Sequence, residues 1–258
     1  MDAPDAAPPK AASVAPQLPD TEGELCVAGL TPALSRRLAA AALPLRLARG
    51  DTVFGPGDPG DVLFVVVRGR VRLERRAEGA REYAPSLLGP GDVFGELTVF
   101  DPSPRGATAR ALTDTELLSI GSAPLRRWLA AEPDAAWQLL GHLARRLRGA
   151  HAVTQTLLAD GVPARIARTL LEFGARFGER TPAGLLVRHG LTQSELALHT
   201  GVSRGSVNRV LTGFAGLRLL RVESRAVLIT DTAGLREQAG QGTAGQGATG
   251  QGSGGKPA

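Results

Sequence analysis

The sequence predicts an α+β fold, with a β domain first, a long helix in the middle and a winged helix-turn-helix at the end. Three observations support it. Short β-type runs separated by Gly, Pro and Asp fill residues 44–121, as in an all-β barrel or jelly roll. An apolar stripe at helical spacing runs through residues 134–159. Residues 192–213 hold two short helical patterns on either side of one glycine.

The first third of the chain predicts an arm, a short helix and then strands. Residues 1–24 are rich in Ala, Pro and Asp without periodicity, which predicts a disordered arm. Residues 30–43 predict a helix with Thr31 as N-cap and Pro32 at its first position. A second short helix is predicted over residues 122–130. The predicted strands lie at 51–54, 61–67, 70–75, 81–88 and 115–120.

A long helix is predicted from Asp134 to about Ala159. Its apolar stripe consists of Trp137, Leu140, Leu143, Leu147, Val153, Leu157 and Leu158. This stripe is larger than one small β domain can cover, so the helix is expected to pair with its copy in a two-stranded coil. Arg145, Arg146 and Arg148 are expected to face mostly away from the stripe.

The stretch 192–213 has the residue types that a helix-turn-helix requires. Thr192 is a candidate N-cap, and Glu195 follows at capping-box spacing. Gly201 suits the tight turn, because a side chain would clash in a left-handed conformation. Ser203 can cap the second helix. That helix is expected to turn an apolar face inward at Val207, Val210 and Leu211.

The outward face of the second helix is polar and basic. In a helix-turn-helix, the first residues of this helix reach base edges in the major groove. Arginine can bind guanine bidentately, and Asn208 or Ser206 could contact a base or a phosphate. The candidate DNA-binding residues are Thr192, Ser203, Arg204, Gly205, Ser206, Asn208 and Arg209. An ordinary helical hairpin is the alternative interpretation.

Around this motif, residues 161–236 are expected to form one winged helix-turn-helix domain. It would comprise a helix at 165–177, a short strand at 185–188 and two wing strands at 218–222 and 226–230. Residues 237–258 repeat Gly and Gln, and this low complexity predicts a disordered tail. Arginines outnumber acidic residues in the 161–230 region, as neutralisation of DNA phosphates requires.

Composition excludes several classes of protein. Cys26 is the only cysteine, which rules out an intramolecular disulfide and a cysteine-held metal or iron–sulfur cluster. The four histidines are scattered, and no catalytic-triad, metal-ligand or phosphate-loop spacing is present, so neither an enzyme nor a metal site is expected. A signal peptide and a long apolar span are also absent, so a soluble cytoplasmic protein without a membrane partner is expected.

The order of domains, together with four motifs, resembles the Crp/Fnr family of transcription regulators, and is similar to its actinobacterial cyclic AMP receptor-like members. The motifs lie at 94–109, 143–147, 160–167 and 192–213. The resemblance spans roughly 26–235. It implies a cyclic-nucleotide-binding-like β-roll (a double-stranded β-helix) at 25–132 and a dimerisation helix at 133–160. A homodimer that binds a palindromic DNA site is then expected, with RNA polymerase as a further candidate partner.

The resemblance also implies an effector site in the β-roll. Glu96 would accept a hydrogen bond from the ribose 2′-hydroxyl, Gly95 would let the backbone approach, and Arg105 would pair with a cyclic phosphate. The implied ligand-binding residues are Gly95, Glu96, Leu97, Arg105, Gly106, Ala107 and His151. Cyclic AMP is the first candidate among cyclic nucleotides. A surface loop with a structural ion pair between Glu96 and Arg105 is the alternative.

Several positions depart from the family pattern. Gly106 replaces the usual Ser or Thr, and Ala150 and His151 replace the polar pair that contacts the purine. Each lost hydrogen bond is worth about 1 kcal/mol, so binding would weaken roughly tenfold or more. Gly205 replaces a glutamate that accepts from cytosine, so a shifted or relaxed DNA preference is expected. A ligand-independent or protein-controlled DNA binder with a degenerate pocket is therefore the alternative function.

Overall fold

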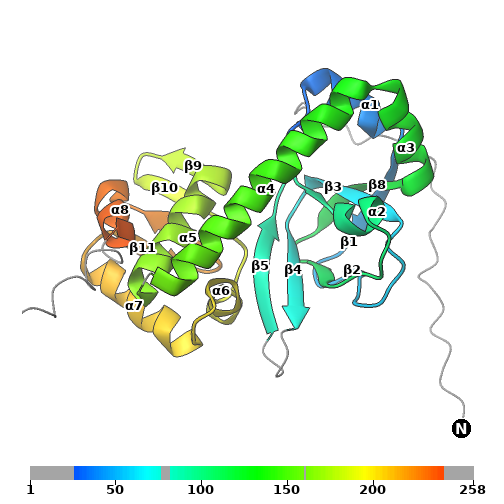
Figure 1. Ribbon diagram of the computed structural model, residues 1–258. Helices are drawn as coiled ribbons and strands as arrows, with labels where there is room; N and C mark the ends of the chain where they lie inside the picture. Colours follow the sequence, from blue (N-terminus) through cyan, green and yellow to red (C-terminus); the bar gives the residue numbers. More distant parts are fainter. Residues whose placement is uncertain (1–25, 77–81, 160, 241–258) are drawn as a thin grey trace, which may run out of the picture.

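The computed structural model describes residues 26–76, 82–159 and 161–240, without the side chains at 76, 82–85 and 150–159. Figure 1 shows the strands of the β domain on one side and helices α5 to α8 on the other, with the long helix α4 running along both. The arm expected at 1–24 and the tail beyond 240 lie outside the described residues.

The β domain consists of two four-stranded antiparallel sheets, with strand orders β1-β8-β3-β6 and β2-β7-β4-β5. Their strands are β1 Leu43–Leu47, β2 Thr52–Phe54, β3 Val62–Arg68, β4 Val71–Arg76, β5 Glu82–Leu88, β6 Val93–Phe94, β7 Thr108–Ala111 and β8 Thr115–Gly121. A cluster that includes Val66, Val71 and Leu117 fills the roll, and the rings of Phe64 and Phe94 stack in it with centroids 5.2 Å apart. This arrangement is the expected β-roll.

Three of these strands were absent from the sequence prediction. Strand β1 carries Pro44 and lies at a sheet edge, β6 has two residues, and β7 is a Thr-Ala-Arg-Ala run of low strand propensity. The expected helix over 30–43 was too long. Helix α1 covers Pro32–Ala40, and Leu43 begins β1 instead.

Helices pack on the outside of the roll. They are α1, α2 Glu96–Phe100, α3 Ser122–Ala131 and α4 Pro133–Ala159. Leu38, Leu63, Leu125 and Trp128 belong to the second core cluster, which lies between α1, α3 and the sheet of β3 and β8. Trp137, Leu140 and Leu147 of α4 are among the exposed large apolar residues, so the predicted stripe is largely uncovered where its side chains are described.

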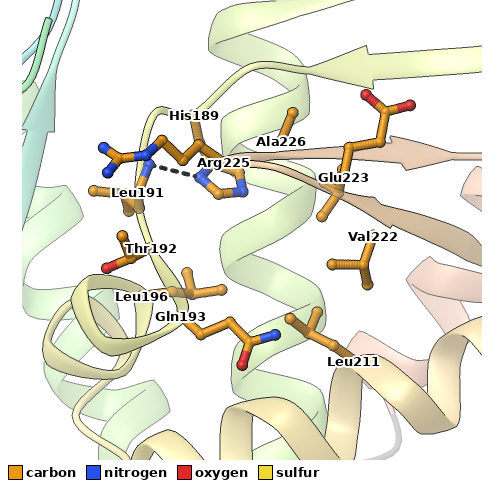
Figure 2. Close-up of a pocket in the computed structure, with 11 residues that line it drawn as sticks. His189, Leu191, Thr192, Gln193, Leu196, Leu211, Val222, Glu223, Arg225 and Ala226 are labelled. Atoms are coloured by element: carbon orange, nitrogen blue, oxygen red, sulfur yellow. Dashed lines mark hydrogen bonds between the residues drawn. The ribbon is translucent and has the colours of Figure 1, made fainter.

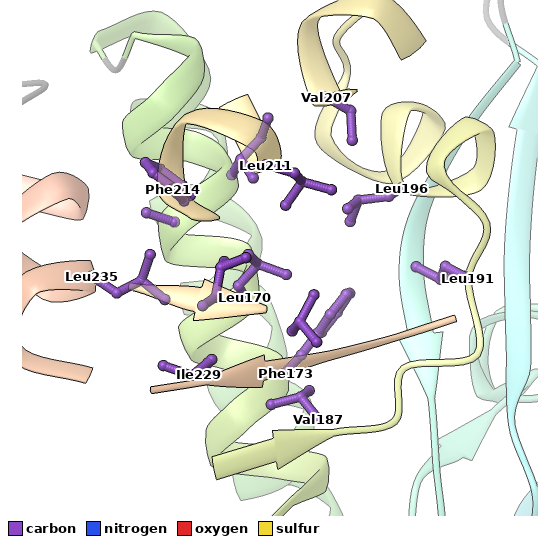
Figure 3. Close-up of a cluster of buried hydrophobic side chains, with 14 of the residues drawn as sticks. Leu170, Phe173, Val187, Leu191, Leu196, Val207, Leu211, Phe214, Ile229 and Leu235 are labelled. Carbon is purple, nitrogen blue, oxygen red and sulfur yellow. The ribbon is translucent and has the colours of Figure 1, made fainter. Parts of the chain in front are cut away.

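The C-terminal domain is built on α5. Its elements are α5 Val162–Phe177, β9 Gly178–Thr181, β10 Gly184–Val187, α6 Gln193–Thr200, α7 Arg204–Gly216, β11 Leu220–Glu223, β12 Ala226–Ile229 and α8 Thr232–Gly240. The strands form one sheet in the order β11-β12-β10-β9. Leu170 and Phe173 of α5 lie at the centre of the core, against Val187, Leu196 and Leu211 (Figure 3).

The C-terminal domain extends further than expected, to the end of helix α8. Residues 237–240 were expected in the disordered tail, but they are helical. The helix packs against α5, where Leu235 is fully buried and Arg168 donates to the Ala239 carbonyl at 2.9 Å. Its single buried leucine and its glycines give a weak helical pattern, which explains why the sequence did not reveal it.

Candidate effector and DNA-binding sites

Glycine is required at the start of α2. Gly95 is the N-cap of this helix, with φ +78°, a left-handed conformation that glycine adopts readily. A Cβ atom there would lie 2.8 Å from Nη1 of Arg105 and 3.0 Å from the Val62 carbonyl oxygen. The turn directs Glu96 into the β-roll, where only 4 % of the residue is exposed.

The partner of Glu96 comes from the long helix. Arg146 of α4 donates from Nη1 to Oε1 of Glu96 at 2.7 Å and to the Val93 carbonyl at 3.1 Å. The sequence had placed Arg146 only away from the apolar stripe and had not predicted this partner. Because α4 passes close to β6, the long arginine side chain can reach a carboxylate fifty residues away along the chain. The only sequence signal was its place inside the 143–147 motif.

Arg105 is buried among neutral acceptors. It donates to the carbonyls of Gly95 and Val62 and to the Thr98 hydroxyl. Its guanidinium carbon lies 4.4 Å from the centroid of the Phe54 ring, and its Nε is buried without a hydrogen-bond partner. Burial lowers the pKa of Arg105, and nearby carboxylates oppose this. Nevertheless, the group stays a cation, since arginine ionises far above neutral pH.

The other expected ligand-binding residues lie near this centre or outside the described part. Leu97 is exposed, Ala107 is buried, and Gly106 is exposed with no atom within 4 Å of the position that a Cβ would take. The side chain of His151 is outside the described residues. The structure thus brings together Gly95, Glu96 and Arg105, while Glu96 pairs with Arg146 rather than with Arg105.

The helix-turn-helix has the expected caps. The Thr192 hydroxyl accepts from the Glu195 amide at 3.2 Å, and Glu195 Oε2 accepts from the Thr192 amide at 2.7 Å, which completes a capping box. Gly201 has φ +66° in the turn. The Ser203 hydroxyl accepts from the Ser206 amide at 3.1 Å at the start of α7. These contacts cap the starts of α6 and α7 and form the turn between them.

Helix α7 presents a basic and polar outer face. Val207, Leu211 and Phe214 are buried beneath it. The residues exposed on the outer face are Arg204, Gly205, Asn208 and Arg209. The three remaining candidates act in caps: Thr192 and Ser203 as described, and Ser206 through a 2.9 Å contact with the Ser203 hydroxyl. Four of the seven candidates are therefore free to meet DNA.

A small cavity of about 70 Å³ separates α6 from the wing (Figure 2). His189 lies at one side, and its Nδ1 accepts from the Leu191 amide at 3.0 Å. The pKa of His189 is lowered to about 4, first by burial and second by the charge of His199, while Glu195 opposes both. The histidine is therefore neutral and shapes the loop before α6. A nucleotide needs several hundred Å³, so this cavity is not an effector site.

Two classes of site were also sought across the ranges that the structure describes. No group of three or more His, Cys, Asp or Glu side chains there is placed to hold a metal ion. No helix among them combines the length and apolar character needed to cross a membrane.

Both halves of the chain match known domain families. Residues 44–132 match the cyclic nucleotide-binding domain, and residues 164–238 match the Crp-like helix-turn-helix domain. A CRP-like cAMP-activated global transcriptional regulator of Mycobacterium tuberculosis is 40 % identical over 211 residues, which cover 82 % of this chain and 94 % of the relative. The chain belongs to the Crp/Fnr family. It is a DNA-binding transcription regulator with a cyclic nucleotide-binding domain, and the family is not one of enzymes, as the sequence indicated.

A further relative and two solved structures are also similar to the chain. The cyclic AMP receptor protein of Thermus thermophilus is 34 % identical, over 74 % of this chain and 85 % of the relative. The c-di-GMP-responsive regulator CLP of Xanthomonas campestris is 27 % identical with a TM-score of 0.65, over 77 % of this chain and 99 % of that one. FixK2 of Bradyrhizobium japonicum, at 21 % identity, shares the fold with a TM-score of 0.68, over 76 % and 96 %.

Proposed function

We propose that the chain forms a cytoplasmic homodimer whose β-roll binds a cyclic nucleotide, cyclic AMP first, and thereby controls binding to a palindromic DNA site. RNA polymerase is the proposed partner at the promoter. One observation carries the effector proposal. A buried carboxylate, Glu96, and a buried cation, Arg105, lie at the two ends of one segment, and only neutral groups contact the cation directly.

The chemistry of a cyclic nucleotide fits these two groups. A buried charge without an opposite charge costs free energy, and an entering phosphate would offset that cost at Arg105. The free Nε of Arg105 remains as a donor. Glu96 would accept from the ribose hydroxyl while it shares its carboxylate with Arg146. The open space beside Gly106 leaves room for the phosphate oxygens.

The dimer proposal is supported by the surface of α4. Trp137 is 78 % exposed, and Leu140 and Leu147 are 58 % and 59 % exposed on the same helix. Leu97 and Phe100 of α2 are exposed as well. A second α4 packed along this stripe would bury it, as in a two-stranded coil. A dimer also presents two α7 helices, which a palindromic site requires.

Calorimetric titration of the purified protein with cyclic AMP tests the effector proposal. We expect binding that Arg105→Gln abolishes, because the cation for the phosphate is lost. Arg46→Gln is the matched control, since it removes the same charge from an exposed ion pair on the same domain. Binding that persists unchanged in Arg105→Gln would reject the proposed pocket.

The alternative is a DNA binder that needs no ligand. The three bonds of Arg105 to Val62, Gly95 and Thr98 favour it, because the protein already satisfies most of the guanidinium. No heat with cyclic AMP, and DNA affinity unchanged by any cyclic nucleotide, would support this alternative over the first.

A further inference from the structure

The β-roll and the DNA-binding domain meet at two ion pairs. Arg72 of β4, which is 9 % exposed, places Nη1 2.6 Å from Oε1 of Glu195 on α6. Arg176, in the last turn of α5, places Nη2 2.5 Å from Oδ2 of Asp92. Burial raises the pKa of Glu195, but bonds with Thr192 and the charge of Arg72 lower it more, so the pKa lies below its usual value. Glu195 therefore stays charged at neutral pH.

Apolar and aromatic contacts also join the two domains. The guanidinium of Arg70 lies 4.1 Å from the centroid of the Phe177 ring at the end of α5. Leu87 of β5 and Leu112 are buried in the same cluster as Phe173 of α5. In Figure 1, α6 lies beside β5 at this contact. Two directional pairs across a packed apolar surface fix the orientation of the two domains as well as their distance.

The turn that holds Asp92 also reaches the effector pocket. Its carboxylate accepts from the Gly89 amide at 2.8 Å, which closes the turn. The next residue, Val93, accepts from Arg146 through its carbonyl, and Arg146 also bonds Glu96. One short segment therefore touches α4 and the pocket on one side and α5 on the other.

We propose that Arg72 and Arg176 are positioning residues, which fix the helix-turn-helix relative to the β-roll and so set the spacing of the two recognition helices in the dimer. The inference rests on the proposed homodimer. Two recognition helices on a palindrome must lie about 34 Å apart. Loss of the fixed orientation would therefore appear as a loss of preference for one half-site spacing. The turn that contains Asp92 would also transmit a structural change at Glu96 to α5, through the ion pair of Asp92 with Arg176.

The test uses the full-length protein and a palindromic duplex that it selects from a random pool. Duplexes with the half-sites one or two base pairs closer or further apart, and a single half-site, complete the set. Two variants are compared: the single variant Arg176→Gln, and the double variant that combines Arg72→Gln and Arg176→Gln. Arg180→Gln is the control, because it removes the same charge from an exposed position in the same domain. Arg176→Lys tests rescue by a residue that keeps the charge.

Discrimination is measured as the Kd for a wrongly spaced duplex divided by the Kd for the correctly spaced one. We expect this ratio to fall at least about fivefold in the double variant, a magnitude typical of coupling between sites. Arg180→Gln and Arg176→Lys should keep the wild-type ratio. For each arginine charge removed, the test variants should lose as much affinity for the single half-site as Arg180→Gln does. An unchanged ratio, or an equal loss on half-site and palindrome, overturns the proposal. A wild-type protein without any spacing preference overturns it too.

A parallel titration separates this proposal from the effector proposal. Wild-type DNA affinity is measured with and without cyclic AMP. If cyclic AMP changes nothing while the double variant still loses spacing discrimination, the effector proposal fails and the positioning role stands. Circular dichroism on each variant identifies any loss of folded protein, so that affinities are compared at equal folded concentration.

Discussion

Arg146 of α4 places Nη1 2.7 Å from Oε1 of Glu96 inside the β-roll. The Glu96 side chain is 6 % exposed and that of Arg146 is 33 % exposed. The ion pair therefore joins a buried carboxylate to a partly exposed guanidinium, which is supplied by the helix that carries the exposed apolar stripe. A shift of α4 against the roll would change the environment of the carboxylate directly.

Removing this arginine should destabilise the protein. Arg146→Gln leaves Glu96 buried without its cation, and a broken buried pair costs several kcal/mol. Because Arg146 is partly exposed, we expect a smaller loss, about 2 kcal/mol in the free energy of unfolding. Urea unfolding measures it. Arg148→Gln, exposed on the same helix, is the control, and an equal effect of the two changes would contradict the assignment.

His189 should make stability depend on pH in a defined window. Its pKa is about 4 when folded, against an ordinary value of 6.5. Between these values the unfolded chain binds a proton that the folded protein does not, so the free energy of unfolding falls as pH drops from 6.5 towards 4. The full loss is about 3 kcal/mol. Urea unfolding at pH 7, 5.5 and 4.5 should show a flatter profile for His189→Asn.

Nuclear magnetic resonance checks the same group without unfolding. The ring C–H signals of His189 should not titrate above pH 5, whereas an exposed histidine titrates near 6.5. Titration of His189 near 6.5 would show that the imidazole is open to water and would remove the basis of the stability prediction.

Glu195 makes a separate contribution to the pH dependence of stability. Since its folded pKa is lowered, its stabilisation is present above pH 4.5 and is lost below it.

The open space at Gly106 predicts a gain of function. Gly106→Ser would add a hydroxyl where no atom lies within 4 Å of the new Cβ. A hydrogen bond to a charged phosphate is worth roughly 1.5 kcal/mol or more, so cyclic AMP should bind about tenfold tighter. Calorimetric titration measures it. Gly95→Ala should act in the opposite direction, because its Cβ would displace Arg105. Unchanged affinity in Gly106→Ser would place the phosphate elsewhere.

The recognition helix should accept a side chain at Gly205. A Cβ there would meet only Ser203 Oγ, at 3.9 Å. Gly205→Glu adds a carboxylate in the first helical turn, which the helix dipole favours, and an acceptor for the cytosine amino group. We expect sites selected from a random pool to gain a fixed cytosine. Gly205→Ala should stabilise the helix by up to about 1 kcal/mol without that change. Identical selected sites for both variants would contradict this assignment.

Local chemistry explains how much of the helix-turn-helix the sequence revealed. Thr192, Glu195, Gly201 and Ser203 act within four residues of their partners, so their spacing alone predicted caps and turn. The five predicted strands of the β-roll and the long helix rest on equally local patterns. Short or polar elements such as β6, β7 and α8 lack such a pattern, because tertiary contacts stabilise them.

The candidate effector site was only partly predictable for the same reason. Glu96 and Arg105 lie in one segment that the family pattern marks. Two of their partners come from distant places: Arg146 from α4 and Val62 from β3. No periodicity links residues that are forty or fifty positions apart, so the pairing of Glu96 with α4 could come only from the fold.

Leu87 and Leu112 of the β-roll are buried in the core cluster of the other domain. A fragment cut near residue 161 would expose this apolar surface to water and leave a gap beside Phe173. The two halves therefore share part of one core even though separate families describe them. Exchange of DNA-binding halves between relatives should succeed only when the residues at Leu87 and Leu112 are exchanged with them.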